Sequence, residues 1–426
     1  MIRGGILITG TEVLTGIIVD KNGPWLSEQM REVGIQPAQI TIVGDRPEDL
    51  VAALESMRAA ELDLVVTSGG LGPTADDLTA EVVGGFQGRE MVLDGPLEER
   101  IGEILAGLSS RWPNLDMDAV RAANRKQAVV PAGSEILDPV GTAPGLIVPP
   151  STEAGPVILV LPGPPRELKP MWHTALESDA LKPILAAAPD YERRIVRMFG
   201  IPESELASAL REMEEKGVDF TGLEVTTCLR RGEIEVATTF EDEYSEAYST
   251  FEDALVERFG ELIHAFDGAT IDQTVAKLLE GSSLAVGESC TGGLFAGRLT
   301  DLPGASAWFR GGVVAYSNKA KSSLLGVDPA LIEAEGAVSE SVATALAEGA
   351  RSRFDAEFGV GITGIAGPDG GTEEKPVGLV WFSVVGPQGT ITRSVVVPGG
   401  RADIRDRATT IGLHLVRRLA LDSAAS

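Results

Sequence analysis

Short apolar runs alternate with amphipathic segments along the first part of the chain. The runs at residues 5–8, 39–43 and 62–66 are typical of strands, and the segments at 23–33 and 47–60 have the spacing of helices with one buried face. Strands that alternate with helices predict a doubly wound α/β sheet. Neither an internal repeat nor a low-complexity tract interrupts the pattern.

The pattern changes at about residue 183. A strand at 194–199 and a helix at 202–213 precede a hairpin, whose strands at 225–230 and 233–239 turn at Arg231 and Gly232. A further helix and strand follow, so we expect a small α+β domain that serves as a spacer or a dimer contact. Residues 267–270 are its expected linker to the rest of the chain.

The last part of the chain returns to an α/β pattern. An apolar run ending at Val286 leads through a turn, 287–293, into a helix that starts near Leu294. The helix at 339–354 carries Ala343, Ala347 and Ala350 on one face, which predicts close packing against strands at 358–362 and 377–385. A long amphipathic helix, 401–421, closes the chain. We therefore predict three domains: 1–178 (α/β), 179–267 (α+β) and 268–426 (α/β).

Composition excludes several classes of protein. The 426 residues suffice for two or three cores, and 36 Lys+Arg against 63 Asp+Glu give a net charge of 36 − 63 = −27, which disfavours direct nucleic-acid binding. Two distant cysteines favour a reducing, cytoplasmic setting, and neither a signal peptide nor a membrane span is visible. Three histidines without i,i+4 spacing exclude a zinc-hydrolase helix motif.

The turn at 287–293 carries two candidate nucleophiles, Ser289 and Cys290. Backbone N–H groups at a helix start favour an oxyanion or a phosphate. Tyr316 and Lys321 follow a likely strand, and a lysine or tyrosine with a lowered pKa can activate a serine. Because the carboxyl ends of strands converge in an open α/β sheet, we expect one crevice here. The alternative is that these are ordinary glycine turns and a surface lysine.

Two further loops belong to this crevice, at 361–371 and 399–405. The second opens the closing helix with Arg401 and Arg405, which could face a phosphate or simply lie on a solvated face.

A second loop with candidate binding residues spans residues 67–79. Its three glycines, Gly69, Gly70 and Gly72, allow a close backbone approach to phosphates, and Thr74 can cap the helix that follows. Asp76 and Asp77 could hold a hard cation or merely complement the helix dipole.

The segment from about residue 270 onwards resembles the CinA C-terminal domain, a family that includes nicotinamide mononucleotide deamidases. The matching motifs are ESCTGG, GGVVAYSN with a lysine five residues after the tyrosine, and GITGIAGPDGG. The resemblance implies Ser289 as the nucleophile, with Tyr316 and Lys321 as its activating partners; Lys319 stands two residues too early. It implies substrate contacts from Thr291, Gly292, Gly293, Thr363, Gly364, Gly367, Arg401 and Arg405.

The first 178 residues resemble the CinA N-terminal domain, which shares its fold with molybdopterin-binding proteins and whose members hydrolyse ADP-ribose. The matches are Asp20 and Asn22, GGLGPTADD, NRKQA, GTAPG and LPGPPREL. The resemblance implies a pyrophosphate held by Gly69, Gly70, Gly72, Thr74 and Arg166, and a divalent metal ion at Asp76, Asp77 and Glu12. Thr11 stands where the family usually has aspartate, so we expect weaker metal affinity. The middle segment resembles the family's KH-like domain but lacks a Gly-x-x-Gly clamp, so RNA binding is not expected.

These observations predict a cytoplasmic, homodimeric enzyme with two activities. Its C-terminal domain would hydrolyse nicotinamide mononucleotide to nicotinate mononucleotide and ammonia without a cofactor, and its N-terminal domain would be a metal-dependent ADP-ribose pyrophosphatase. The alternative is a nucleotide-binding regulatory protein of DNA uptake or repair that does no catalysis.

Overall fold

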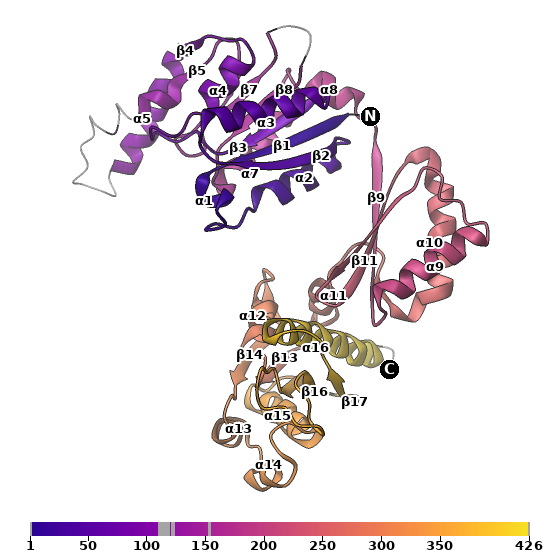
Figure 1. Ribbon diagram of the computed structural model, residues 1–426. Helices are drawn as coiled ribbons and strands as arrows, with labels where there is room; N and C mark the ends of the chain where they lie inside the picture. The colour runs from indigo at the N-terminus through magenta and orange to yellow at the C-terminus, as the bar shows by residue number, and fades with distance from the viewer. Residues whose placement is uncertain (1, 110–119, 121–123, 152–154, 425–426) are drawn as a thin grey trace. The chain divides into compact units, whose positions relative to one another are not determined.

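The computed structural model describes residues 2–109, 120, 124–151 and 155–424 (Figure 1). The chain divides into two compact units, Met1–Tyr191 and Glu192–Ser426. The predicted boundary at 267/268 falls inside the second unit and stays a prediction. Within the described ranges, every helix is too short or too polar to cross a lipid bilayer.

A six-stranded sheet forms the centre of the first unit. Its order is β2-β1-β3-β8-β7-β6. The first four strands of this order are parallel, as the alternating pattern predicts, whereas β7 and β6 add an antiparallel edge. The strands are β1 (Arg3–Thr9), β2 (Gln36–Val43), β3 (Leu64–Ser68), β6 (Glu135–Leu137), β7 (Gly145–Val148) and β8 (Val157–Leu161).

Helices cover both faces of this sheet because alternate strand residues point to opposite sides. Leu7 joins the core beneath α3, α4 and α5, whereas Ile6 and Ile8 join the core beneath α2 and α7. A separate ribbon pairs β4 (Met91–Leu93) with β5 (Val129–Pro131). The helices are α1 (Thr11–Leu14), α2 (Asn22–Glu32), α3 (Pro47–Ala59), α4 (Thr79–Phe86), α5 (Gly95–Ser109), α7 (Pro165–Leu176) and α8 (Lys182–Ala187).

The second unit begins with a four-stranded sheet of order β10-β11-β9-β12, packed against α9 and α10. The predicted hairpin is confirmed: Arg231 and Gly232 have φ of 56° and 91°, the left-handed pair that a two-residue turn requires. The elements are β9 (Tyr191–Phe199), α9 (Glu203–Glu215), β10 (Glu224–Arg230), β11 (Glu233–Glu241), α10 (Ser245–Phe259) and β12 (Ile263–Ala265).

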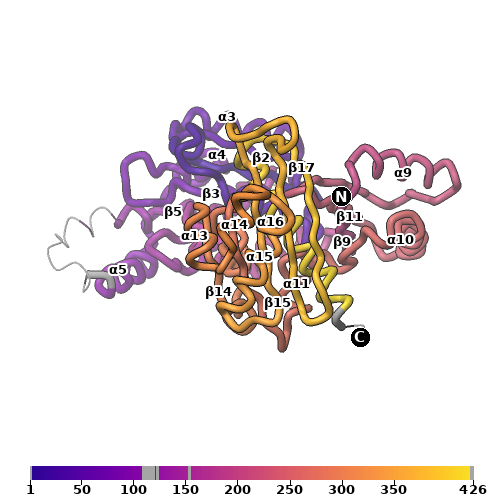
Figure 2. Tube along the Cα trace, turned by 90° about the horizontal axis from the view of Figure 1, so that it is seen from below, coloured from indigo at the N-terminus to yellow at the C-terminus, as the bar shows by residue number. Residues whose placement is uncertain are grey.

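A five-stranded sheet of order β14-β13-β15-β16-β17 completes the second unit (Figures 1 and 2). β14, β13 and β15 are parallel, and the hairpin of β16 and β17 adds two antiparallel strands. The strands are β13 (Leu284–Glu288), β14 (Phe309–Val314), β15 (Phe358–Gly364), β16 (Leu379–Gly386) and β17 (Gly389–Val396). The helices are α11 (Ile271–Leu278), α12 (Leu294–Thr300), α13 (Asn318–Leu325), α14 (Pro329–Glu335), α15 (Glu340–Arg353) and α16 (Arg401–Ala424).

The predicted close packing of α15 is confirmed. Ala343, Ala347 and Ala350 are fully buried, and β15 meets the helix with Gly359 and Gly361. A side-chain carbon on Gly361 would lie 2.0 Å from the carbonyl oxygen of Ala343, so nothing larger than glycine fits there.

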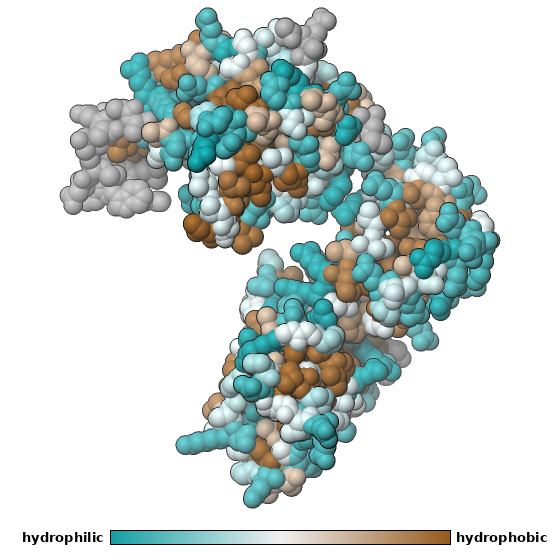
Figure 3. Space-filling view, in the orientation of Figure 1, coloured by the Kyte–Doolittle hydropathy of each residue, from teal (hydrophilic) through white to brown (hydrophobic). Residues whose placement is uncertain are grey.

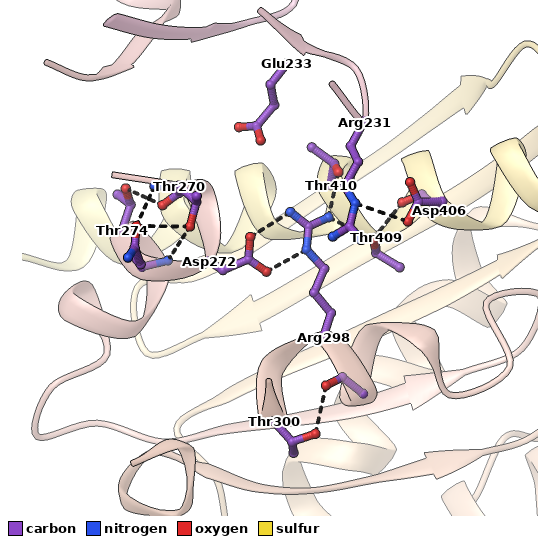
Figure 4. A network of polar contacts seen from close by, with 12 residues as sticks. Arg231, Glu233, Thr270, Asp272, Thr274, Arg298, Thr300, Asp406, Thr409 and Thr410 are labelled. Atoms are coloured by element: carbon purple, nitrogen blue, oxygen red, sulfur yellow. Dashed lines mark hydrogen bonds and ion pairs between the residues drawn. The ribbon is translucent and has the colours of Figure 1, made fainter. Parts of the chain in front are cut away.

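A buried arginine links three helices on the opposite face of the sheet. Arg298 of α12 forms a bidentate ion pair with Asp272 of α11, at 2.5 and 2.7 Å (Figure 4). Its remaining nitrogen donates to the hydroxyls of Thr409 and Thr410 on α16. Because the bidentate geometry satisfies the buried guanidinium, this pair fixes α16 against the start of the domain.

Candidate functional sites

The predicted residues of the C-terminal domain gather at one edge of the five-stranded sheet. Ser289 follows β13 directly, Tyr316 follows β14, and Thr363 and Gly364 end β15. β17 runs in the same direction as β15, because both are antiparallel to β16, so α16 also starts at this edge. The predicted convergence of these loops is confirmed.

Ser289 and Lys321 are in direct contact. Lys321 Nζ lies 3.0 Å from Ser289 Oγ and 3.1 Å from the carbonyl oxygen of Ala315. The lysine is 2% exposed and comes from α13, whose N-terminus is capped by Ser317. Burial lowers the pKa of Lys321 below its ordinary value of 10.5. A buried amine with a lowered pKa is the form of lysine that can accept a proton from serine.

Cys290, the other candidate nucleophile, lies in a different environment. Its side chain is 5% exposed and belongs to the hydrophobic core together with Phe295. Burial raises the pKa of its thiol to about 12, so the thiolate is not populated near neutral pH. The surroundings favour Ser289 over Cys290 as the nucleophile.

Glu288, which the sequence analysis assigned no role, organises the turn. Its carboxylate is 1% exposed and accepts hydrogen bonds from the backbone N–H groups of Gly293, Phe295 and Ala296, at 2.9, 3.1 and 2.9 Å. These N–H groups at the start of α12 are therefore occupied by a side chain. The signal was an acid at the end of a buried strand, one residue before the nucleophile.

The arginines of α16 hold the two sides of the site together. Arg405 donates to the carbonyl oxygens of Cys290 and Thr291, at 3.1 and 2.8 Å. Arg401 donates to the carbonyl oxygen of Gly367 at 2.8 Å and to the Tyr316 hydroxyl at 2.7 Å. Tyr316 is 58% exposed and contacts Arg401, whereas Lys321 contacts Ser289.

The other predicted contacts have structural partners as well. The Thr363 hydroxyl donates to the carbonyl oxygen of Ala337 at 2.7 Å, and the Gly292 N–H donates to the carbonyl oxygen of Ser289 at 3.1 Å. A side-chain carbon on Gly364 would lie 2.7 Å from the carbonyl oxygen of Leu379. These residues shape the edge of the sheet around Ser289.

The first unit contains a cavity of about 760 Å³ at the carboxyl ends of its parallel strands. Two loops form much of its lining, one after β1 and one after β3, and exposed aliphatic residues of the first loop lie beside it. Ile17 and Val19 are 81% and 76% exposed. Figure 3 shows apolar surface on the first unit in the region where Figure 1 draws α1. The predicted residues that line the cavity are Glu12, Gly69, Gly70, Gly72, Thr74, Asp76 and Asp77.

The glycines of the loop at 67–79 are required by its own packing. Gly69 and Gly70 have φ of 110° and 66°, values that side chains rarely adopt. A carbon added to Gly70 would lie 2.0 Å from Thr79 Oγ1, and one added to Gly72 would lie 2.4 Å from Asp77 Oδ2. The loop is therefore compact before any ligand binds.

Thr74 orients the two aspartates. Its hydroxyl lies 2.5 Å from both Asp76 Oδ1 and Asp77 Oδ2, and its N–H donates to Asp77 Oδ2 at 2.8 Å. The hydrogen bond from the Thr74 hydroxyl lowers the pKa of Asp76. Arg166 is 86% exposed, lies 3.6 Å from Glu167, and is not part of the cavity lining.

Thr11, which stands where the family usually has aspartate, binds a carboxylate from the loop after another strand. The Thr11 N–H and hydroxyl both donate to Asp45 Oδ2, at 3.0 and 2.8 Å, and Asp45 lines the cavity. Asp45 is not among the residues that the sequence motifs indicated. Its signal was an acid just after the second strand of the sheet, where ligand-binding residues are expected.

A cluster outside both predicted sites has the composition of a metal site. Among the residues that the structure describes, one group of three His, Cys, Asp or Glu side chains has its ligand atoms all within 4.8 Å of one another: Glu233, His264 and His414. The predicted metal ligands Glu12, Asp76 and Asp77 line one cavity without forming such a group.

Two family models match the chain, and several known proteins are similar to it. The model of the CinA C-terminal domain matches residues 269–420, and that of the probable molybdopterin binding domain matches residues 5–185. A "CinA-like protein" of Mycolicibacterium paratuberculosis is 55% identical over 99% of both chains, and one of Mycobacterium tuberculosis is 54% identical over 98% of this chain and 97% of its own. The crystal structure of the competence/damage inducible protein CihA from Agrobacterium tumefaciens is 36% identical, covers 37% of this chain and 99% of its own, and has a TM-score of 0.34.

Proposed function

We propose, for a chain that belongs to the family of CinA-like proteins, that the C-terminal domain is an amidohydrolase with Ser289 as its nucleophile and Lys321 as its base. The substrate that we propose is nicotinamide mononucleotide, which the motif resemblance implies. The observation that carries the proposal is the 3.0 Å contact between Lys321 Nζ and Ser289 Oγ, both buried, at the end of a central strand.

The first half-reaction forms an ester. Neutral Lys321 takes the proton of Ser289 Oγ as the oxygen attacks the carboxamide carbon. The N–H groups of Gly292 and Gly293 already donate to Ser289 O and to Glu288, so the oxyanion would use those of Cys290 and Thr291. The carbon–nitrogen bond then breaks, and Lys321 returns the proton to the departing ammonia.

The second half-reaction releases the acid. Water attacks the ester carbon while Lys321 accepts one of its protons, and the returning proton regenerates the Ser289 hydroxyl. The sum is one carboxamide and one water converted to one carboxylic acid and ammonia. Arg401 and Tyr316, which are bonded to each other at the exposed rim, are the proposed contacts for the nucleotide part of the substrate.

The test is ammonia release from nicotinamide mononucleotide by the full-length protein. We expect turnover by the wild type, its loss in Ser289→Ala and its retention in Cys290→Ala. The two side chains are adjacent and similarly buried, which makes Cys290→Ala a matched control. Turnover by Ser289→Ala, or its loss in Cys290→Ala alone, contradicts the assignment. No turnover by the wild type favours the regulatory alternative.

We propose metal-dependent hydrolysis of ADP-ribose as a second function, at the cavity of the first unit. The supporting observation is that carboxylates from separate loops, Glu12, Asp45 and Asp77, line a cavity of about 760 Å³. Small hard cations are commonly bound through one or two carboxylates together with substrate phosphates, so a closed group of protein ligands is not required. When bound, such an ion would neutralise the pyrophosphate and polarise it towards attack by water.

The assay for this second function is AMP release from ADP-ribose over a series of divalent ions. We expect release to depend on the ion and to fall in Asp77→Asn, with Asp94→Asn in the same unit as a control outside the cavity lining. Metal-independent release, or unchanged release by Asp77→Asn, excludes the site.

A further inference from the structure

We propose that Glu233, His264 and His414 bind one divalent transition-metal ion such as zinc. Because its ligands come from the four-stranded sheet and from helix α16, this ion would hold the two together. Glu233 starts β11, His264 lies in β12, and His414 lies in the middle of α16. The three ligands therefore come from two parts of the second unit that are far apart in sequence. Neither proposed activity requires this ion.

The donor atoms are already gathered. Glu233 Oε1 lies 2.8 Å from His264 Nε2 and 2.9 Å from His414 Nε2. Ligands bound to zinc at 2.0–2.1 Å in a tetrahedron are separated by about 3.3 Å, so a widening of about half an ångström admits the ion. Figure 4 shows Glu233 directed towards α16.

His264 supplies the second observation. It lies within hydrogen-bonding distance of the carboxylate, yet within the described part of the chain both of its buried ring nitrogens lack a hydrogen-bond partner. In a metal site, the donor atoms of two ligands point at the metal position and not at each other. A ring nitrogen that is close to a carboxylate but makes no hydrogen bond with it is expected of such a pair. An unsatisfied buried polar atom destabilises a fold, and an ion bound at Nε2 would satisfy that nitrogen.

The surroundings hold the ligands in position. The Phe199 ring stacks on His414 at 3.9 Å with an interplanar angle of 8°, and the two imidazoles meet edge to face at 4.9 Å. A cavity of about 550 Å³ borders the cluster on the side of His414, Phe199 and Glu261, and its lining includes neither Glu233 nor His264.

The chemistry selects the class of ion. Two imidazoles and one carboxylate suit zinc, cobalt and nickel, whereas magnesium and calcium prefer oxygen ligands alone. Three protein ligands leave a fourth position for water. The ion would reinforce the ion pair of Arg231 with Asp406, at 3.5 Å, which joins the same two parts (Figure 4).

The test is a zinc titration of the full-length protein after removal of metal with a chelator, in competition with a coloured chelator. We expect one tight equivalent in the wild type. Glu233→Gln and His264→Gln should each weaken this binding by more than about tenfold, because even the outer partners of metal ligands contribute 10–100-fold. The control variant is His173→Gln, which removes the remaining histidine and should bind as the wild type does.

Cobalt distinguishes this site from an oxygen-only site, because a four-coordinate ion with imidazole ligands absorbs visible light strongly. The intense bands should appear in the wild type and disappear in Glu233→Gln. Zinc should also raise the Tm of the wild type and leave that of Glu233→Gln unchanged. No tight equivalent in the wild type, or wild-type affinity in His264→Gln, overturns the proposal. The wild-type titration decides even if a variant fails to fold.

Discussion

Lys321 is the residue whose protonation state controls the proposed chemistry. A base must be neutral to accept a proton, so kcat/KM should rise as the pH passes upward through the pKa of Lys321. Because burial lowers that pKa, the rise should fall below pH 10.5, where an ordinary lysine titrates. Arginine keeps its proton at any working pH, so Lys321→Arg should lose about 10²–10⁴-fold in rate.

Initial rates of ammonia release over a pH series measure both effects. Lys319→Arg makes the same change on the exposed face of the same helix and should leave the profile unaltered. A Lys321→Arg protein with the rate and pH profile of the wild type would show that the base lies elsewhere.

In the first unit, Asp45 is the residue on which we expect the metal dependence to rest. Thr11 holds its carboxylate at the cavity through two hydrogen bonds. If a metal ion binds there, Asp45→Asn should raise the ion concentration for half-maximal ADP-ribose hydrolysis by about tenfold, as loss of a carboxylate near a metal does. Asp49→Asn, on the exposed first turn of α3, is the control. Equal metal dependence in both variants would remove Asp45 from the site.

At the scale of elements, Glu288 connects strand β13 to helix α12. Its carboxylate satisfies three backbone N–H groups that the start of a helix otherwise leaves unpaired. Glu288→Gln puts an amide in its place, whose NH₂ group cannot accept these bonds. We expect a loss of about 1–3 kcal/mol in the free energy of unfolding. We also expect a lower kcat with little change in KM, because the turn that carries Ser289 loosens.

Urea unfolding and steady-state kinetics test this role. Glu340→Gln changes a glutamate in the first turn of α15, which is capped instead by Ser339, and should behave as the wild type. Unchanged stability and kcat in Glu288→Gln would mean that the three hydrogen bonds do not hold the turn.

Helices, strands and turns were predictable from the sequence where a local pattern of residues determines them. The apolar runs and helical periods placed β13, α15 and the hairpin at Arg231 within a few residues of their observed positions. The antiparallel edge strands β6 and β7 were not predicted, because the direction of a strand depends on pairing across the sheet. The role of Glu288 was missed for a similar reason: its partners are backbone groups, which leave no trace in side-chain spacing.

At the scale of the whole molecule, the two compact units have separate cores. The hydrophobic clusters of the first unit draw on residues up to Ile184 and Leu185, and those of the second begin at Val196. A fragment of residues 192–426 should therefore fold and release ammonia from nicotinamide mononucleotide at the rate of the full chain. Circular dichroism and the ammonia assay measure both properties. A folded but inactive fragment would show that the first unit takes part in deamidation.

A site was predictable from the sequence where its reactive residues lie in short, recognisable motifs. The motifs placed Ser289 and Lys321 in one crevice, and the structure brings their side chains into contact. The group of Glu233, His264 and His414 spans 181 residues between its first and last members, so no spacing rule could reveal it. The net charge of −27 likewise describes the whole chain and not the two guanidinium groups of Arg401 and Arg405 at the site.

The most direct measurement of the central claim is the mass of the peptide that contains Ser289, after the enzyme is quenched with acid during turnover of nicotinamide mononucleotide. The account predicts an adduct equal to the substrate minus ammonia on Ser289, and no adduct and no turnover in Ser289→Ala. An adduct on Cys290, or wild-type turnover by Ser289→Ala, would contradict it.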